Sequence, residues 1–112
     1  MNVLPVLALD AVVPETTQTS EAISTAYLTS VSMHAILAGS SSTAVTVTLE
    51  MTNELTPENW VAVTSGSFDF TSNGQKMLRV DTAYRWMRVV STDTGSTSGG
   101  TLSVWFFGSG ND

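Results

Sequence analysis

Strict alternation of apolar and polar residues between positions 45 and 52 constrains the fold more than any other feature of this sequence. One face of this segment would carry Val45, Val47, Leu49 and Met51. The other face would carry Thr46, Thr48, Glu50 and Thr52. A period of two is typical of a β-strand with one buried and one solvated face. The segment therefore predicts a sheet whose apolar face packs against a second layer.

The stretch from Tyr84 to Phe107 predicts the centre of the fold. Its two halves are rich in β-branched and aromatic residues, and they flank a Gly/Ser/Thr loop at 92–100. Such halves predict two antiparallel strands joined by a long hairpin loop. The stretch also contains Trp86 and Trp105, two of the three tryptophans. We expect the weaker strands upstream to pack against it.

Shorter segments complete the predicted sheets. Alternation predicts a strand within 22–37, and apolar content predicts short strands at 60–63, 68–70 and 77–81. Serine and threonine outnumber the charged residues, which make up 12% of the chain, and threonine suits the solvent face of a strand. A chain of 112 residues is long enough for one core. The prediction is an all-β, single-domain, antiparallel β-sandwich, jelly-roll-like, with an extended N-terminal arm.

Residues 1–14 are predicted to be this extended N-terminal arm or an edge strand, and residues 15–112 the sandwich domain. The segment is apolar, but it is interrupted by Pro5 and closed by Pro14. Proline has no backbone N–H donor, so it fits an edge strand or an arm better than a central strand. Two interpretations stay open: a first strand that closes the sandwich, and an arm that reaches a neighbouring subunit.

The charge of the chain excludes one class of partner. A net charge of −6 and a pI near 4.4 argue against nucleic-acid binding, which needs Lys and Arg to neutralise phosphates. All four basic residues fall in one short segment: Lys76, Arg79, Arg85 and Arg88. On neighbouring strands they would form a positive strip that faces an acidic partner. The alternative is a set of local salt bridges, each worth about 0–1 kcal/mol when exposed.

No catalytic residue, metal site or cofactor is predicted. The chain has no cysteine, which excludes disulfides and thiolate metal sites. His34 is the single histidine and has no second ligand at metal-binding spacing. Glu50, Glu54 and Glu58 lack the regular spacing of calcium ligands. A glycosidase is the weakest alternative, because its carboxylate pair is recognised by distance and not by sequence. We therefore expect a protein that is not an enzyme.

We expect neither a secretory signal nor a membrane-spanning segment. Met1–Val13 has no basic n-region, so we do not expect a secretory signal. No run approaches the ~20 apolar residues of a membrane span, and no membrane partner is predicted. The expectation is a soluble protein made in a cytoplasm.

From position 45 onwards, four segments follow one another as a strand, a tryptophan-bearing strand, a Tyr-x-x-x-Arg-Val strand and a strand after a Gly/Ser tip. They are Val45–Asn53, Glu58–Val63, Tyr84–Val90 and Gly100–Val104. This succession resembles small β-sandwich virion structural proteins of tailed bacteriophages. Similar patterns occur in discoidin-like and carbohydrate-binding jelly rolls, so the pattern is specific for a sandwich rather than for one role.

The resemblance implies a role in the virion without enzymatic activity. Proteins of this kind decorate or cement the capsid, or belong to the tail, and are assembled in the host cytoplasm. The implied partners are the major capsid protein or another virion protein, together with further copies of the chain in a homo-oligomer. The residues predicted to form the interfaces are Val3, Leu4, Val6, Leu7, Arg79, Arg85, Arg88 and Trp105.

Aromatic residues support an alternative from another class. In the last strand, the alternation of Leu102, Val104 and Phe106 with their neighbours leaves Trp105 or Phe107 partly exposed. Exposed rings of this kind serve as a subunit interface or as a platform for sugars, while core packing across the sandwich is the commoner explanation for such aromatic residues. The alternative is therefore a carbohydrate-binding module, or a receptor-binding tail module, that binds a glycan. The rings that would stack on the sugar are Trp60, Tyr84 or Trp105.

Overall fold

The structure of the chain, a computed structural model, describes residues 2–12, 17–26, 28–40, 44–81, 84–93 and 99–110. In these ranges the regular secondary structure consists of nine strands. They are β1 (Asn2–Val12), β2 (Thr17–Thr19), β3 (Ile23–Ser24), β4 (Ser30–Ala38), β5 (Val45–Thr52), β6 (Val61–Phe70), β7 (Gly74–Val80), β8 (Trp86–Asp93) and β9 (Thr101–Ser109). The described ranges contain no helix with the length and apolarity of a membrane span.

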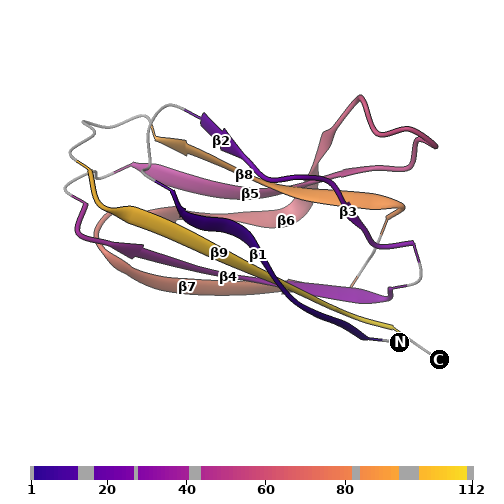
Figure 1. The fold of residues 1–112 in the computed structure, drawn as a ribbon, viewed down its shortest axis with the longest axis horizontal. Helices are drawn as coiled ribbons and strands as arrows, with labels where there is room; N and C mark the ends of the chain where they lie inside the picture. Colours follow the sequence, from indigo (N-terminus) through magenta and orange to yellow (C-terminus); the bar gives the residue numbers. More distant parts are fainter. Residues whose placement is uncertain are drawn as a thin grey trace.

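The strands form two antiparallel sheets that pack face to face (Figure 1). Sheet A has the strand order β1-β9-β4-β7, and sheet B has the order β2-β8-β5-β6, with β3 also paired to β8. With β2 and β3 sharing one position, this order is that of a jelly roll. The predicted all-β, single-domain sandwich is confirmed.

The core lies between the two sheets, where alternate residues of each strand meet. Sheet B contributes Val45, Val47 and Leu49 of β5, none of which has exposed surface. Sheet A contributes the buried residues of β4 and β9, which include Met33 and Phe106. Burial of one such side chain stabilises the fold by about 1.5–3 kcal/mol. The alternation that predicted β5 and β9 therefore also identifies their buried faces.

The prediction that residues 84–107 form a hairpin of two paired strands is wrong. β8 pairs with β5 and β2 in sheet B, whereas β9 pairs with β1 and β4 in sheet A. The two strands therefore face each other across the core and do not lie side by side. The physical reason is that alternation defines which face of a strand is buried, but not which strand is its neighbour. Residues 94–98 of the predicted loop lie outside the described residues.

The N-terminal segment is an edge strand in this structure. β1 pairs along β9, and the register shifts between Val3 and Val6, between Leu7 and Leu9, and between Leu9 and Val12. The first irregular interval contains Pro5, which has no N–H to donate to a ladder. Of the two interpretations left open, the strand that closes the sandwich is the one observed here. Exchange of this segment between subunits stays a prediction.

Two other segments differ from their predicted extent. The strand predicted within 22–37 is divided into β3 in sheet B and β4 in sheet A. The chain crosses between the sheets at a turn in which Leu28 N–H donates to the Thr25 carbonyl and the Thr25 hydroxyl donates to the Tyr84 carbonyl. The strands predicted at 60–63 and 68–70 are one strand, β6, which includes Ser65 at a φ of 60°.

We expect Phe106→Ala to lower the free energy of unfolding by about 3–5 kcal/mol, because it opens a cavity in a core that has little room to collapse. Phe107→Ala is the matched control, since this ring is 38% exposed on the opposite face. Its cost should stay below about 1.5 kcal/mol. Urea denaturation followed by tryptophan fluorescence measures both values. Equal losses would contradict the assignment of the two faces of β9.

Candidate functional site

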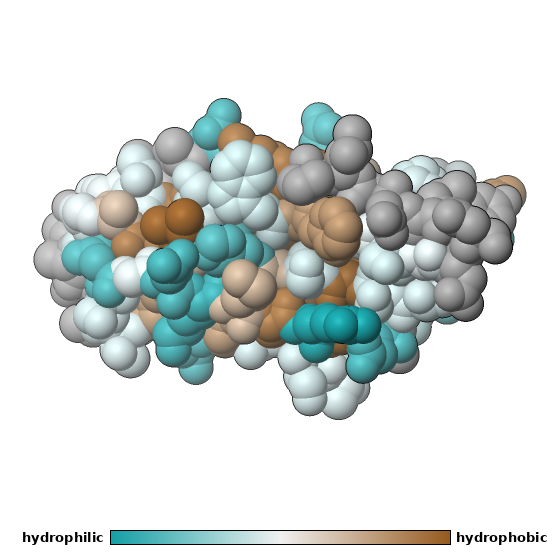
Figure 2. Space-filling model, turned by 90° about the horizontal axis from the view of Figure 1, so that it is seen from below, coloured by the Kyte–Doolittle hydropathy of each residue, from teal (hydrophilic) through white to brown (hydrophobic). Residues whose placement is uncertain are grey.

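The outer face of sheet A exposes large apolar side chains and is the candidate functional site. Ile36, Met77, Trp105 and Phe107 are exposed by 39%, 67%, 40% and 38%. They lie on the central strands β4 and β9 and on the edge strand β7. Figure 2 shows this face, with brown apolar side chains interspersed among teal hydrophilic ones. Several large apolar side chains exposed on one face of a sheet mark it as a candidate interaction site.

Strand register brings four of these positions into one row across sheet A. Leu7 lies opposite Trp105, Trp105 lies opposite His34, and His34 lies opposite Met77. The row therefore crosses all four strands, and we call it the Trp105 row. His34 Nε2 is 2.9 Å from Gln75 Oε1, and this hydrogen bond positions the imidazole within the Trp105 row. Neighbours directly across an antiparallel pair have Cβ atoms about 4.5–5.5 Å apart, so these side chains form a continuous surface.

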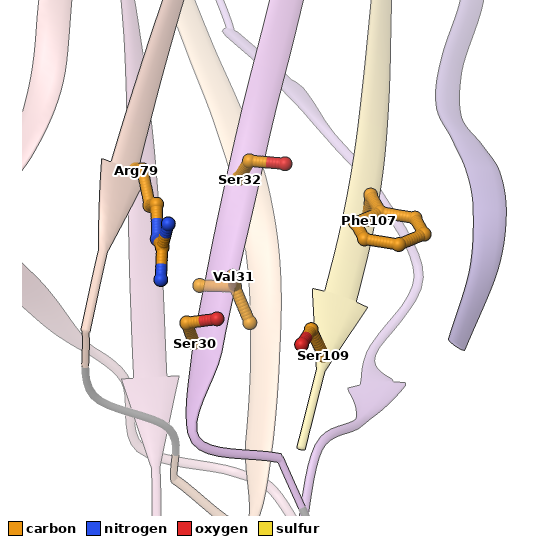
Figure 3. Close-up of a pocket in the computed structure, with 6 residues that line it drawn as sticks. All are labelled: Ser30, Val31, Ser32, Arg79, Phe107 and Ser109. Carbon is orange, nitrogen blue, oxygen red and sulfur yellow. The ribbon is translucent and has the colours of Figure 1, made fainter. Parts of the chain in front are cut away.

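A groove of about 230 Å³ lies on the same face, two positions along β4, β7 and β9 from the Trp105 row. Figure 3 shows the residues that line it. It is lined by Ser30, Val31 and Ser32 of β4, Arg79 of β7, and Phe107 and Ser109 of β9. Ser32 lies opposite both Arg79 and Phe107, so the guanidinium and the ring flank the β4 hydroxyls. We call this site the Arg79–Phe107 groove. It combines a cation, an aromatic ring and several hydroxyl groups.

The charge around the groove differs from that of the chain as a whole. β4, β7 and β9 contain no acidic residue, and β7 contributes Arg79 to this face. Lys76 lies opposite the buried Ala35, so it is on the other face of β7. Arg79 Nε forms an ion pair with Asp81 Oδ1 at 3.0 Å, and both side chains are largely exposed. An exposed pair of this kind contributes about 0–1 kcal/mol, so it is easily exchanged for another partner. The face is therefore less negative than expected for a chain with a net charge of −6.

The predicted strip of basic residues is not formed. Lys76 and Arg79 lie in β7 of sheet A, whereas Arg88 lies in β8 of sheet B and Arg85 directly precedes that strand. The strip required neighbouring strands, and β7 and β8 belong to opposite sheets. The alternative of local salt bridges describes Arg79 and Arg88.

Arg88 belongs to a cluster on the outer face of sheet B. Its Nε and NH2 atoms both lie 2.7 Å from Glu50 Oε1. Its guanidinium also lies 4.4 Å from the centre of the Trp60 ring. One face of the Trp60 ring is thus covered by the Arg88 guanidinium, and a sugar cannot stack on that face. Tyr84 packs against the core. Of the three rings predicted for glycan stacking, Trp105 is the one that the structure presents on an uncovered face.

The remaining predicted interface residues belong to β1. Val6 is half-buried against the core, and Leu7 belongs to the Trp105 row. The backbones of Val3 and Leu4 lie within β1, but their side chains lie outside the described residues. Sequence reasoning missed the contributions of His34, Met77 and Ile36, because only the register of β4 shows that they share a face with Trp105. The apolar content of β7 was the one available signal for Met77.

The acidic residues form no metal cluster in the part of the chain that the structure describes. Glu54 is engaged within its own loop: its Oε1 accepts hydrogen bonds from the backbone N–H groups of Asn59 at 2.6 Å and Glu58 at 3.1 Å. Its Oε2 accepts a third from Asn59 Nδ2 at 3.0 Å. The Asn59 N–H bond, followed by the other donors, lowers the pKa of Glu54 from 4.5 to about 2. This carboxylate stabilises the turn between β5 and β6.

Protonation of Glu54 should weaken this loop at low pH. Because the pKa of Glu54 is lower in the folded chain than in the unfolded one, its stabilising effect is complete above pH 4.5 and is lost as the pH falls towards 2. Glu54→Gln should therefore lose less stability than the wild type over this range. Urea denaturation at intervals between pH 6 and pH 2, with a carboxyl NMR titration of Glu54, measures the effect. Parallel pH profiles for the two proteins would contradict this assignment.

Comparison with known proteins gives a likeness of fold. No family model matches the chain, and no curated protein matches it in sequence. Among solved structures, it is similar to the crystal structure of PirA, with a TM-score of 0.66 and 13% sequence identity. The alignment covers 88% of this chain and 93% of that chain. The β-sandwich fold is therefore shared with a solved protein over nearly the whole length of both chains.

Proposed function

We propose that this protein is a non-enzymatic virion structural protein, a capsid decoration or cement protein of a tailed bacteriophage. Its partners are the major capsid protein and neighbouring copies of the chain, and its location is the virion. The sequence resemblance supports this proposal, as does the jelly roll, a fold found in viral capsid and lectin domains. The fold-level argument is an analogy, so the site has to support the role.

The observation that carries the proposal is the apolar outer face of sheet A. Met77 and Trp105 remain exposed although the core beneath them is complete. A docking partner would remove this apolar surface from water, which is favourable by about 25 cal/mol per Å². A contact made by a few exposed side chains is weak by itself. Repetition of this contact over a symmetric shell makes the assembly stable.

Under this proposal, purified particles should contain the chain in numbers close to those of the major capsid protein. Quantitative mass spectrometry of the particles measures the ratio. The double variant Met77→Ser/Trp105→Ser should reduce the number of bound copies by at least tenfold, because it removes the apolar surface that docks. A handful of copies per particle, or none, would overturn a decoration role.

Leu55→Ser is the matched control for this double variant. Leu55 is 81% exposed and lies in the loop between β5 and β6, away from sheet A. Loss of an exposed apolar side chain there should leave the copy number unchanged. An equal loss in both variants would show that the outer face of sheet A is not the docking surface.

A second candidate function is a carbohydrate-binding or receptor-binding module. The Arg79–Phe107 groove favours it, because sugars are bound by aromatic rings together with hydroxyl and charged groups. Trp105 lies two residues from Phe107 on the same strand and the same face, so two rings are available in sequence along β9. The indole of Trp105 combines an apolar face with a polar N–H group, whereas Phe107 offers an apolar face alone.

If the chain binds glycans, Trp105→Ala should lower affinity at least tenfold while the fold is preserved. Trp60→Ala is the control, since Arg88 occupies a face of that ring. A glycan array screened with the wild type identifies the ligand, and titration calorimetry compares the variants, with circular dichroism as the test of folding. A wild type that binds no glycan on the array would remove this candidate.

A further inference from the structure

We infer that the Arg79–Phe107 groove binds an acidic sugar, one ring bearing a carboxylate, and that the next sugar of the same oligosaccharide stacks on Trp105. The inference rests on the second candidate function and specifies the ligand class of that site. It commits to a carbohydrate, because the groove pairs an aromatic ring with several hydroxyl groups. An acidic peptide would need the Arg79 cation, but it would not need an aromatic ring beside several hydroxyl groups.

The size of the groove limits its occupant to a single ring. Its volume of about 230 Å³ is below the ~300–1,000 Å³ of pockets for drug-sized ligands. Phe107 offers an apolar surface on one side, and the hydroxyls of Ser30, Ser32 and Ser109 lie on and between β4 and β9 (Figure 3). A pyranose ring has this same division, with an apolar C–H face and a rim of hydroxyl groups.

Charge selects a carboxylate rather than a neutral sugar. Arg79 Nε is paired with Asp81, which orients the guanidinium but engages one side of it. The planar fork of a guanidinium can bind a carboxylate through two parallel hydrogen bonds. The absence of acidic residues from β4, β7 and β9 means that an anion meets little repulsion from these strands. Asp81 is the nearest competing carboxylate, and its pair is exposed and exchangeable.

The direction of β9 defines where a second sugar would lie. Outward residues two positions apart on a strand are separated by roughly 7 Å. A ligand that begins at Phe107 therefore reaches Trp105 within one further sugar ring. His34, which lies opposite Trp105 and is hydrogen-bonded to Gln75, adds a polar group beside this second position.

The test uses two acidic probes, a galacturonic acid trimer and sialyllactose, each with its carboxyl-reduced counterpart of identical length and linkage. Titration calorimetry should show binding of at least one acidic probe and at least tenfold weaker binding of its reduced form. Arg79→Gln and Phe107→Ala should each weaken binding tenfold or more. Arg85→Gln removes the same charge outside the groove and should leave affinity unchanged. Circular dichroism verifies that each variant is folded.

Each other outcome overturns the inference in a distinguishable way. Equal binding of acidic and reduced probes would overturn the acidic subsite but leave the glycan-binding candidate standing. Equal losses in Arg79→Gln and Arg85→Gln would show a general effect of charge and no specific site. Competition by a poly-glutamate peptide at the same concentration would indicate an acidic peptide as the partner. Binding of neither acidic probe would overturn the inference, while the glycan array separately decides the second candidate function.

Discussion

The packing of inward-facing side chains between the two sheets is the constraint on which the rest of this structure depends. Met33 and Phe106 of sheet A and Leu49 and Met87 of sheet B belong to one core cluster, in which none of the four has exposed surface. Because successive residues of a strand point to opposite sides, each buried residue places its neighbours on an outer face. The exposure of Trp105 and Phe107 is therefore a consequence of the burial of Leu102, Val104 and Phe106.

The two outer faces differ in how they meet solvent. On sheet B, polar side chains pair with one another: Thr46 with Asp69, Thr48 with Ser67, and Glu50 with Arg88. On sheet A, the outward positions of β9 and β7 include Trp105 and Met77, which have no layer above them in the described chain. This asymmetry places the proposed interaction surface on sheet A. It also places the acidic residues of the strands mainly on sheet B.

The alternation of apolar and polar residues predicted much of the fold. The predictions failed where they depended on which strands are neighbours in a sheet. The alternation at 45–52 and 101–107 identified two strands and their buried faces correctly. The hairpin between the halves of 84–107 was wrong, as was the positive strip from Lys76 to Arg88. Both errors have one cause: the connection after a strand can return to the same sheet or cross to the other, and the periodicity of the strands is the same in both cases. β7 ends at Val80 and β8 begins at Trp86, yet these two strands belong to opposite sheets.

By itself, the sequence determined that this chain forms β-strands, that one face of each central strand is apolar, and that an aromatic residue near the C-terminus is exposed. These properties depend on residues two positions apart, so they can be read locally. Only the tertiary structure decided that Leu7, His34 and Met77 form a row with Trp105, and that Arg79 lies across Ser32 from Phe107. Register between distant strands is set by how the whole core packs, and no local pattern contains it.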